Sequence, residues 1–272
     1  MEKAISADGT PIAYSRTGSG PAIVLVDGAF GHRSFGPNES LVPLLAPHFT
    51  VYTYDRRGRG DSGDTQPYAV QREIEDVRAV IEAAGGSAFL YGISSGAVLA
   101  IEAAAAGLPV TRLAVFEPPF VVDDNRAPLS ADYAEQVAAL TAADDRGALV
   151  KLFMTKAAGV PAFGVFMMRL MPVWKALKGL AHTVQYETAV LGDGQSGRPL
   201  APGRWDVAAP TLVVGGTKSP LWMKNSVESV ATVLPNARLH MLPGQNHIVK
   251  AAALAPVLID FFADAKVDKK AA

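Results

Sequence analysis

The feature that most constrains the fold is a regular alternation of short apolar runs with segments of helical periodicity. The runs have the length of strands that are buried on both faces. We expect strands at residues 4–7, 12–16, 22–26, 49–54, 88–91, 113–116, 211–214 and 237–241. Helices are expected at residues 40–45, 70–84, 96–106 and 248–265. The alternation predicts an α/β protein with a mostly parallel, eight-stranded sheet and helices on both faces.

Residues 121–206 break this alternation, because they carry helical patterns and no strand pattern. Helices are expected there at residues 131–143, 146–157, 162–171 and 174–190. We therefore expect a core of residues 1–120 and 207–272, with residues 121–206 inserted as a helical cap between strands six and seven. Large apolar side chains of the cap either line a substrate site or form the cap's own core. These are Phe163, Phe166, Met167, Met168, Met171 and Trp174.

Composition excludes several classes of function. The chain has 25 Lys+Arg against 26 Asp+Glu, and this balance argues against a nucleic-acid partner. It has no cysteine, which excludes disulfides, thiolate metal sites and a cysteine nucleophile. No metal-binding histidine spacing, no P-loop and no G-x-G-x-x-G at the first strand–helix turn is present, so we expect neither a metal nor an organic cofactor.

The sequence also predicts where the protein acts and in what form. Its start has no apolar core of signal-peptide length, and charges and a proline interrupt the most apolar stretch, residues 160–177. We expect a cytoplasmic monomer or homodimer with no membrane span that acts on a small molecule. The final residues, VDKKAA, are expected to form a frayed, solvated end.

A short motif marks a candidate nucleophile. Residues 92–96 read Gly-Ile-Ser-Ser-Gly, which fits G-x-S-x-G between an expected strand and an expected helix. The two glycines permit the sharp turn that such a strained serine needs, and the helix N-terminus favours developing negative charge. We interpret Ser94 as a nucleophile; the alternative is a tight turn without chemistry.

With this motif, three further segments resemble the α/β-hydrolase superfamily over most of the chain. Residues 54–63, YDRRGRGDSG, are similar to the family's D-x-R-G-x-G-x-S turn. Residues 26–28 stand where the family usually has His-Gly, and residues 242–247, LPGQNH, resemble the loop that carries its catalytic histidine. The resemblance implies a serine hydrolase in which His247 is the general base. It also implies an oxyanion hole made by the backbone N–H groups of Ala29 and Ser95.

The third member of the triad departs from the family pattern. The turn after strand seven reads GGTKSP and has no carboxylate, where the family usually has Asp. Members that resemble haloalkane dehalogenases in this respect take the acid from the end of strand six, and Glu117 stands there. We expect Glu117 to orient His247, with Asp123 and Asp124 as weaker candidates. The alternative is a solvent-facing Glu117.

Two further expectations concern charged residues near this site. Asp27 replaces the usual histidine and is expected to point away from the oxyanion site, where its charge would oppose the reaction. The arginines of the turn are expected to pair with aspartates of the same turn. The arginines are Arg56, Arg57 and Arg59, and the aspartates are Asp55, Asp61 and Asp64.

The function implied is hydrolysis of an ester, lactone or related acyl bond of a small, largely apolar substrate through an acyl-enzyme. Ser94 argues against epoxide hydrolases and dehalogenases, which use Asp at this turn. The same residues also suit C–C cleavage, acyl transfer, cyclisation or cofactor-free haloperoxidation. A ligand-binding protein on the hydrolase scaffold is a third alternative, supported by the missing Asp after strand seven.

Overall fold

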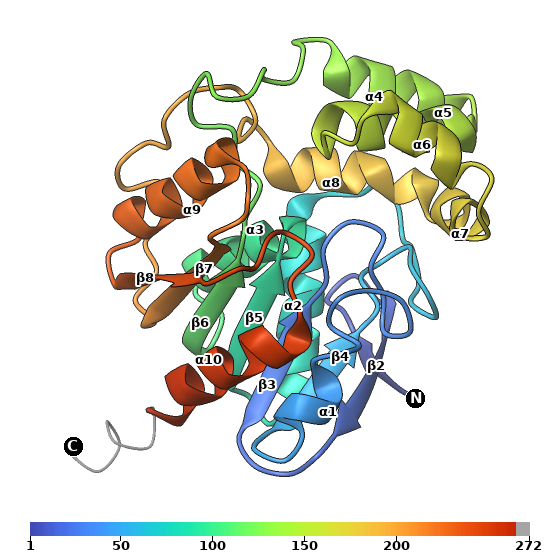
Figure 1. The fold of residues 1–272 in the computed structure, drawn as a ribbon. Helices are drawn as coiled ribbons and strands as arrows, with labels where there is room; N and C mark the ends of the chain where they lie inside the picture. The colour runs from blue at the N-terminus through green and yellow to red at the C-terminus, as the bar shows by residue number, and fades with distance from the viewer. Residues whose placement is uncertain (265–272) are drawn as a thin grey trace.

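The computed structural model describes residues 1–264 and contains one eight-stranded sheet (Figure 1). Its strands are β1 (Glu2–Ile5), β2 (Pro11–Thr17), β3 (Ala22–Val26), β4 (Thr50–Tyr54), β5 (Ala88–Ile93), β6 (Val110–Phe116), β7 (Thr211–Gly216) and β8 (Ala237–Leu242). They lie in the order β1-β2-β4-β3-β5-β6-β7-β8. β2 pairs antiparallel with β1 and β4, and every other neighbouring pair is parallel. The predicted α/β sheet is confirmed.

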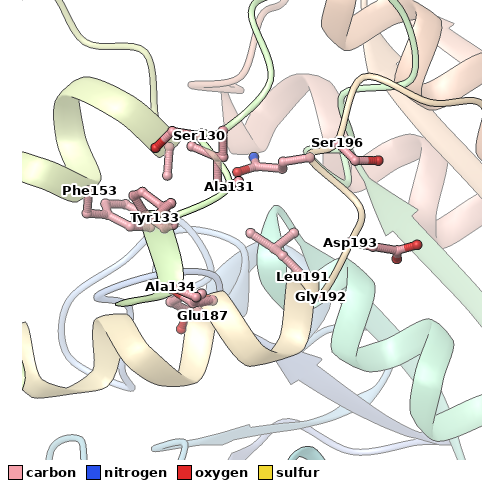
Figure 2. A pocket seen from close by; sticks show the side chains of 14 residues that line it. Ser130, Ala131, Tyr133, Ala134, Phe153, Glu187, Leu191, Gly192, Asp193 and Ser196 are labelled. Atoms are coloured by element: carbon pink, nitrogen blue, oxygen red, sulfur yellow. The ribbon is translucent and has the colours of Figure 1, made fainter. Parts of the chain in front are cut away.

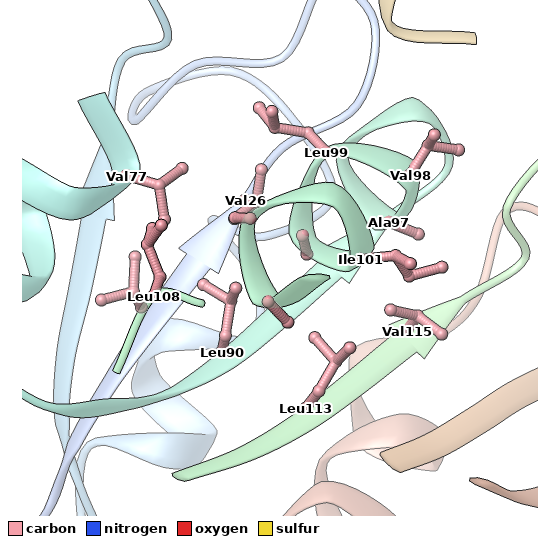
Figure 3. Close-up of a cluster of buried hydrophobic side chains, with 14 of the residues drawn as sticks. Val26, Val77, Leu90, Ala97, Val98, Leu99, Ile101, Leu108, Leu113 and Val115 are labelled. Atoms are coloured by element: carbon pink, nitrogen blue, oxygen red, sulfur yellow. The ribbon is translucent and has the colours of Figure 1, made fainter. Parts of the chain in front are cut away.

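The sheet is buried on both faces because its central strands are apolar throughout. Successive side chains of a strand point to opposite faces. Val24 and Val26 of β3 therefore belong to one buried cluster, and Ile23 and Leu25 belong to the other. Figure 3 shows part of the first cluster, where Leu90 and other strand side chains pack against the helix after β5.

Five helices cover the two faces of the sheet. They are α1 (Val42–Leu45), α2 (Val70–Ala83), α3 (Ser95–Ala105), α9 (Leu221–Val233) and α10 (Ala251–Ala263). In Figure 1, α1 and α10 lie on one face, and α2, α3 and α9 lie on the other. The sequence analysis missed α9, although Met223, Val227 and Val230 recur at helical spacing and are buried. The expected end at residue 265 and the VDKKAA tail lie outside the described residues.

A helical segment, residues 117–210, connects β6 to β7, and we call it the β6–β7 segment. It contains α4 (Tyr133–Ala142), α5 (Arg146–Leu152), the π-helical turn η1 (Phe153–Ala157), α6 (Ala162–Met168), α7 (Val173–Gly179), the 3₁₀ turn η2 (Ala181–Thr183) and α8 (Val184–Leu191). The helix expected at residues 174–190 is therefore three shorter elements. Figure 1 shows α4–α8 grouped on one side of the sheet.

The large apolar side chains of this segment do not share one environment. Trp174 is buried and Met168 packs against it in a cluster that belongs largely to the segment itself. The other four are exposed, namely Phe163, Phe166, Met167 and Met171. Of the two alternatives, the structure supports the segment's own core for Trp174 and Met168, and none of the six residues lines the cavity described below.

Candidate active site

Ser94 occupies a sharp turn between β5 and α3. Its backbone angles are φ 56° and ψ −129°, a conformation that costs free energy for any residue except glycine. A Cβ on Gly92 would lie 2.3 Å from the carbonyl oxygen of Gly96. A Cβ on Gly96 would lie 2.5 Å from the carbonyl oxygens of Val26 and Asp27. The turn therefore requires glycine at both positions, and it presents Ser94 at the carboxyl end of the sheet.

His247 lies in the loop that follows β8, and this loop is held against the end of β7. The N–H of Thr217 donates to the Leu242 carbonyl at 3.0 Å, and the N–H of Lys218 donates to the Gln245 carbonyl at 2.8 Å. A Cβ on Gly216 would lie 2.3 Å from the Gln245 carbonyl oxygen, so the close approach depends on glycine. This packing brings the imidazole back over the sheet.

Glu117 directly follows β6 and is fully buried, at 0% exposure. Its Oε2 lies 2.9 Å from Nδ1 of His247. Its Oε1 accepts hydrogen bonds from the backbone N–H of Gly216, at 2.8 Å, and from the hydroxyl of Ser219. A buried carboxylate needs such partners to remain charged. The last residue of β7 and the turn after it thus supply donors to a carboxylate that directly follows β6.

The two weaker candidates for the triad acid, Asp123 and Asp124, have different surroundings from Glu117. Asp123 accepts from the Asn225 side chain and from the backbone N–H of Asn125, and Asp124 is exposed. Neither makes a hydrogen bond to His247 among the described residues. The structure therefore brings Glu117 and His247 together, and the alternative of a solvent-facing Glu117 is wrong.

The loop after β3 passes directly over Ser94. A Cβ on Gly28 would lie 3.0 Å from the Cβ of Ser94. The Gly28 carbonyl accepts a hydrogen bond from Nη1 of Arg59 at 2.6 Å, and the Gly31 carbonyl accepts from the same nitrogen at 3.1 Å. In a trans peptide the C=O and the following N–H point in opposite directions. The N–H of Ala29 therefore points away from Arg59.

The three buried arginines of the turn after β4 pair with carboxylates outside their own turn. Arg56 binds Glu73 and Glu187, Arg59 also binds Glu187, and Arg57 binds Asp76 and Asp8. Burial opposes the charge of Glu73, but the Arg56 guanidinium outweighs it and lowers the Glu73 pKa. The expected pairing within the turn is wrong. Asp55 and Asp61 bind Arg33 instead, and Asp64 accepts from Tyr186.

Asp27 is buried inside the loop after β3. Burial raises the pKa of its carboxyl to about 7, although Arg59 and Arg56 oppose the shift. A Cβ on Gly31 would lie 2.8 Å from the Cβ of Asp27, and one on Gly36 would lie 3.0 Å from its Oδ1. The carboxyl group therefore occupies the interior of the loop.

A cavity of about 590 Å³ lies over the serine turn, and we call it the main cavity. Ser94, Ser95, Ala29 and His247 all line it. The remaining described lining residues are Gly28, Phe30, Pro37, Ile93, Pro119, Phe153, Met154, Ala157, Ala158, Gly159, Leu191, Gln195, Pro220, Trp222, Met223 and Ile248. His247 is the ionisable side chain in this set, and the remainder are almost all apolar. Phe153 and Trp222 were not predicted as site residues. The apolar residues at helical spacing in residues 221–233 could have indicated α9 and, with it, Trp222.

The described residues, 1–264, offer neither a metal site nor a membrane-spanning helix. That part of the chain contains no cluster of three or more His, Cys, Asp or Glu side chains arranged to hold a metal ion. Among its helices, none combines the length and apolarity that a membrane crossing requires.

A mostly parallel eight-stranded sheet, with a serine on the turn after β5 and a histidine in the loop after the last strand, defines the α/β-hydrolase fold. The chain belongs to the alpha/beta hydrolase family, whose model matches residues 23–257.

Several known proteins are similar to the chain. An alpha/beta hydrolase structure from Sphaerobacter thermophilus is 50% identical, with a TM-score of 0.89 over 96% of this chain and 100% of that one. The enol-lactonase structure from Burkholderia xenovorans is 22% identical, with a TM-score of 0.70 over 96% of this chain and 99% of that one. A Mycobacterium tuberculosis protein named "Putative non-heme bromoperoxidase BpoC" is 27% identical over 94% of this chain and 98% of its own.

Proposed function

We propose that this protein is a serine hydrolase that cleaves an ester, lactone or related acyl bond of a small, largely apolar substrate. The observation that carries the proposal is the hydrogen bond between His247 and the buried Glu117, at the edge of a cavity that Ser94 also lines. A carboxylate that is buried and fully hydrogen-bonded can fix an imidazole and stabilise its protonated form.

In the first half of the proposed reaction, Ser94 Oγ attacks the substrate carbonyl and Nε2 of His247 accepts its proton. Nδ1–H of His247 donates to Glu117, which fixes the ring and the tautomer. The negative charge on the carbonyl oxygen is stabilised by the N–H groups of Ala29 and Ser95. The protonated His247 then gives its proton to the leaving group, and an acyl-enzyme remains on Ser94.

In the second half, water attacks the acyl-enzyme while Nε2 of His247 accepts one of its protons. The acid is released, and the proton returns to Ser94. The apolar lining of the main cavity lowers the local polarity, so interactions with the developing oxyanion become stronger than in water. The cavity also suits an apolar acyl or leaving group.

We further propose that the β6–β7 segment acts as a cap over this site. Its residues supply one side of the main cavity through Phe153, Met154, Leu191 and Gln195. Different side chains at these positions would change which substrates fit, while the sheet would keep Ser94 and His247 in place.

Hydrolysis of p-nitrophenyl esters tests the proposal. Ser94→Ala is expected to lower kcat by roughly 10³-fold or more, because the nucleophile is lost. Ser95→Ala is the matched control: it removes a hydroxyl from the same cavity but keeps the backbone N–H, so kcat is expected to change by no more than a few fold. Hydrolysis that survives Ser94→Ala would contradict the proposal. A fluorophosphonate that labels a residue other than Ser94 would also contradict it.

The relative from Mycobacterium tuberculosis favours one second candidate, cofactor-free haloperoxidation. Hydrogen peroxide in place of water would attack the same acyl-enzyme and release a peracid, which oxidises bromide. Repeating the assay with peroxide and bromide, and measuring bromination of a dye, separates the two reactions. Refusal of Ser94 to react with the fluorophosphonate would instead favour a ligand-binding protein.

A further inference from the structure

A second, smaller cavity of about 240 Å³ adjoins the main cavity, and we call it the side chamber. The residues that line both cavities are Phe153, Ala157, Leu191 and Gln195. Figure 2 shows the side chamber with Phe153 and Leu191 in its wall. The two cavities therefore meet at a shared wall, and the side chains of this wall decide whether one ligand can occupy both.

Phe153 is the largest and the most accessible of the shared residues. Its side chain is half-buried, whereas Ala157, Leu191 and Gln195 are 6%, 6% and 4% exposed. Truncation of a large side chain in a packed wall leaves a space, because the surroundings collapse only in part. Removal of the Phe153 ring would therefore open the wall between the two cavities.

The Phe153 ring is held in place from the core side of the site. It packs edge-on against Phe30, with the ring centroids 5.2 Å apart and the planes at 84°. This is a favourable geometry for two aromatic rings. Phe30 follows Ala29 directly and lines the main cavity as well. The contact fixes the position of Phe153 relative to the loop that passes over Ser94.

The turn that carries Phe153, η1, is anchored at its other end by Arg126. Nη2 of Arg126 donates to the carbonyls of Lys156 and Ala157, at 2.7 and 2.6 Å. Its guanidinium also lies over the Trp222 ring, 4.3 Å from the centroid, in a cation–π contact. Trp222 belongs to α9 of the core and lines the main cavity. A wall that is fixed at both ends limits the length of a ligand instead of moving aside.

The side chamber can take an apolar chain once the ring is removed. Leu129, Ala131 and Ala134 contribute apolar side chains to its lining. The two carboxylates among its lining residues, Glu187 and Asp193, pair with arginines that do not line the chamber. Their charges are therefore compensated without a ligand.

We infer that Phe153 is a specificity-determining residue, whose ring ends the main cavity and keeps the apolar group of a substrate out of the side chamber. The inference rests on the proposed function and extends it: the substrates are esters or lactones whose apolar group is short enough to fit between Ser94 and Phe153. The main cavity, at about 590 Å³, is large enough for such a substrate by itself.

Ligand binding to the Ser94→Ala protein tests the inference without requiring turnover. The probes are linear methyl ketones of graded chain length, which resemble the ester but lack a leaving group. Isothermal titration calorimetry gives each Kd. In this parent protein, each added methylene is expected to lower Kd by about fourfold until the chain reaches Phe153, and longer ketones are expected to gain nothing.

Phe153→Ala on the same background is expected to extend the gain, so that the longer ketones bind about tenfold more tightly than they bind the parent. Met154→Ala is the matched control, because Met154 belongs to the same turn and lines the main cavity but not the side chamber. Its length limit is expected to stay that of the parent. If Phe153→Ala does not fold, Phe153→Leu removes part of the ring and is expected to give a smaller gain of the same kind.

Ala134→Phe shows whether the longer chains enter the side chamber. Ala134 is exposed and lines the side chamber but not the main cavity, so a larger side chain there occupies the chamber alone. Added to Phe153→Ala, this substitution is expected to cancel the gain for the longer ketones. Added to the parent, it is expected to leave every Kd within about twofold.

Three outcomes overturn the inference: longer ketones that bind the parent and the Phe153→Ala variant equally, a Met154→Ala variant that extends the limit as far, or a gain that Ala134→Phe leaves unchanged. Failure of the proposed function is distinguishable from these outcomes. A wild-type protein that hydrolyses no ester, but whose Ser94→Ala variant shows this length limit and its release by Phe153→Ala, would contradict hydrolysis and leave the role of Phe153 intact.

Discussion

At the scale of single residues, Glu117 is the position where local sequence and final environment differ most. The local sequence leaves a solvent-facing Glu117 open as the alternative to a triad acid, but the residue is fully buried and adopts a φ of 44°. The three hydrogen bonds of its carboxylate, with His247, Gly216 and Ser219, come from the last residue of β7 and from the loops after β7 and β8. The strain and the burial are offset by these bonds, which are available only once the sheet has formed.

Glu117→Gln is expected to lower kcat by roughly 10²- to 10⁴-fold with little change in KM, because a neutral amide cannot stabilise the imidazolium. Steady-state kinetics on the ester substrate measure both constants. Asp123→Asn is the control, since Asp123 binds Asn225 and does not contact His247. A Glu117→Gln protein with wild-type kcat would remove Glu117 from the mechanism.

At the scale of elements, the turn after β4 supports the loop after β3. Arg59 donates to the Gly28 and Gly31 carbonyls, and Arg56 donates to the Asp27 carbonyl at 3.3 Å. Both arginines also bind Glu187 of α8. The orientation of the Gly28–Ala29 peptide therefore depends on the position of α8. We propose that Arg59 is a positioning residue for the Ala29 N–H.

Arg59→Lys is expected to lower kcat by roughly 10- to 100-fold while KM stays within a few fold, because the oxyanion exists in the transition state and not in the bound substrate. A lysine keeps the charge but loses the guanidinium fork, in which Nη1 donates to both carbonyls while Nη2 binds Glu187. Arg57→Lys is the matched control, because Arg57 binds Asp76 and Asp8 and makes no hydrogen bond to the loop. Equal loss of kcat in both variants, or a change confined to KM, would contradict this role.

At the scale of the whole molecule, buried charge links folding to pH. The buried Asp27 carboxyl has a pKa of about 7, raised from 3.8, so between about pH 4 and pH 7 the folded protein holds a proton that the unfolded chain has released. Its contribution to the free energy of unfolding is complete below pH 4 and is lost as the pH rises through 7.

Asp27→Asn removes this titration. The free energy of unfolding of the variant, relative to wild type, is expected to increase as the pH rises from about 4 to about 7, by up to about 1.4 kcal/mol per pH unit, and to level off above 7. Urea denaturation at a series of pH values measures the difference. Asp260→Asn, at an exposed position of α10, is the control and is expected to give a constant difference. A constant difference for Asp27→Asn as well would exclude Asp27 as the group responsible.

Local signals were sufficient for much of the fold and for part of the site. The apolar run at residues 22–26 matches β3 at both ends, and the glycines around Ser94 indicated the turn correctly. Boundaries elsewhere moved by a few residues, because the last hydrogen bonds of a strand depend on its neighbours. The helix expected at residues 174–190 is broken near Leu180, and Gly179, the last residue of α7, was the local signal for this break.

Features that depend on neighbouring residues could be predicted without coordinates: the order of strands and helices, the serine turn, and the histidine loop as a candidate. Tertiary structure alone decided which distant groups meet. The partners of Arg56, Arg57 and Arg59 lie up to 131 residues away, and Glu117 reaches His247 across 130 residues. Such pairings are selected by burial and by the need of each charge for a partner, and neither condition exists until the sheet and the helices have packed.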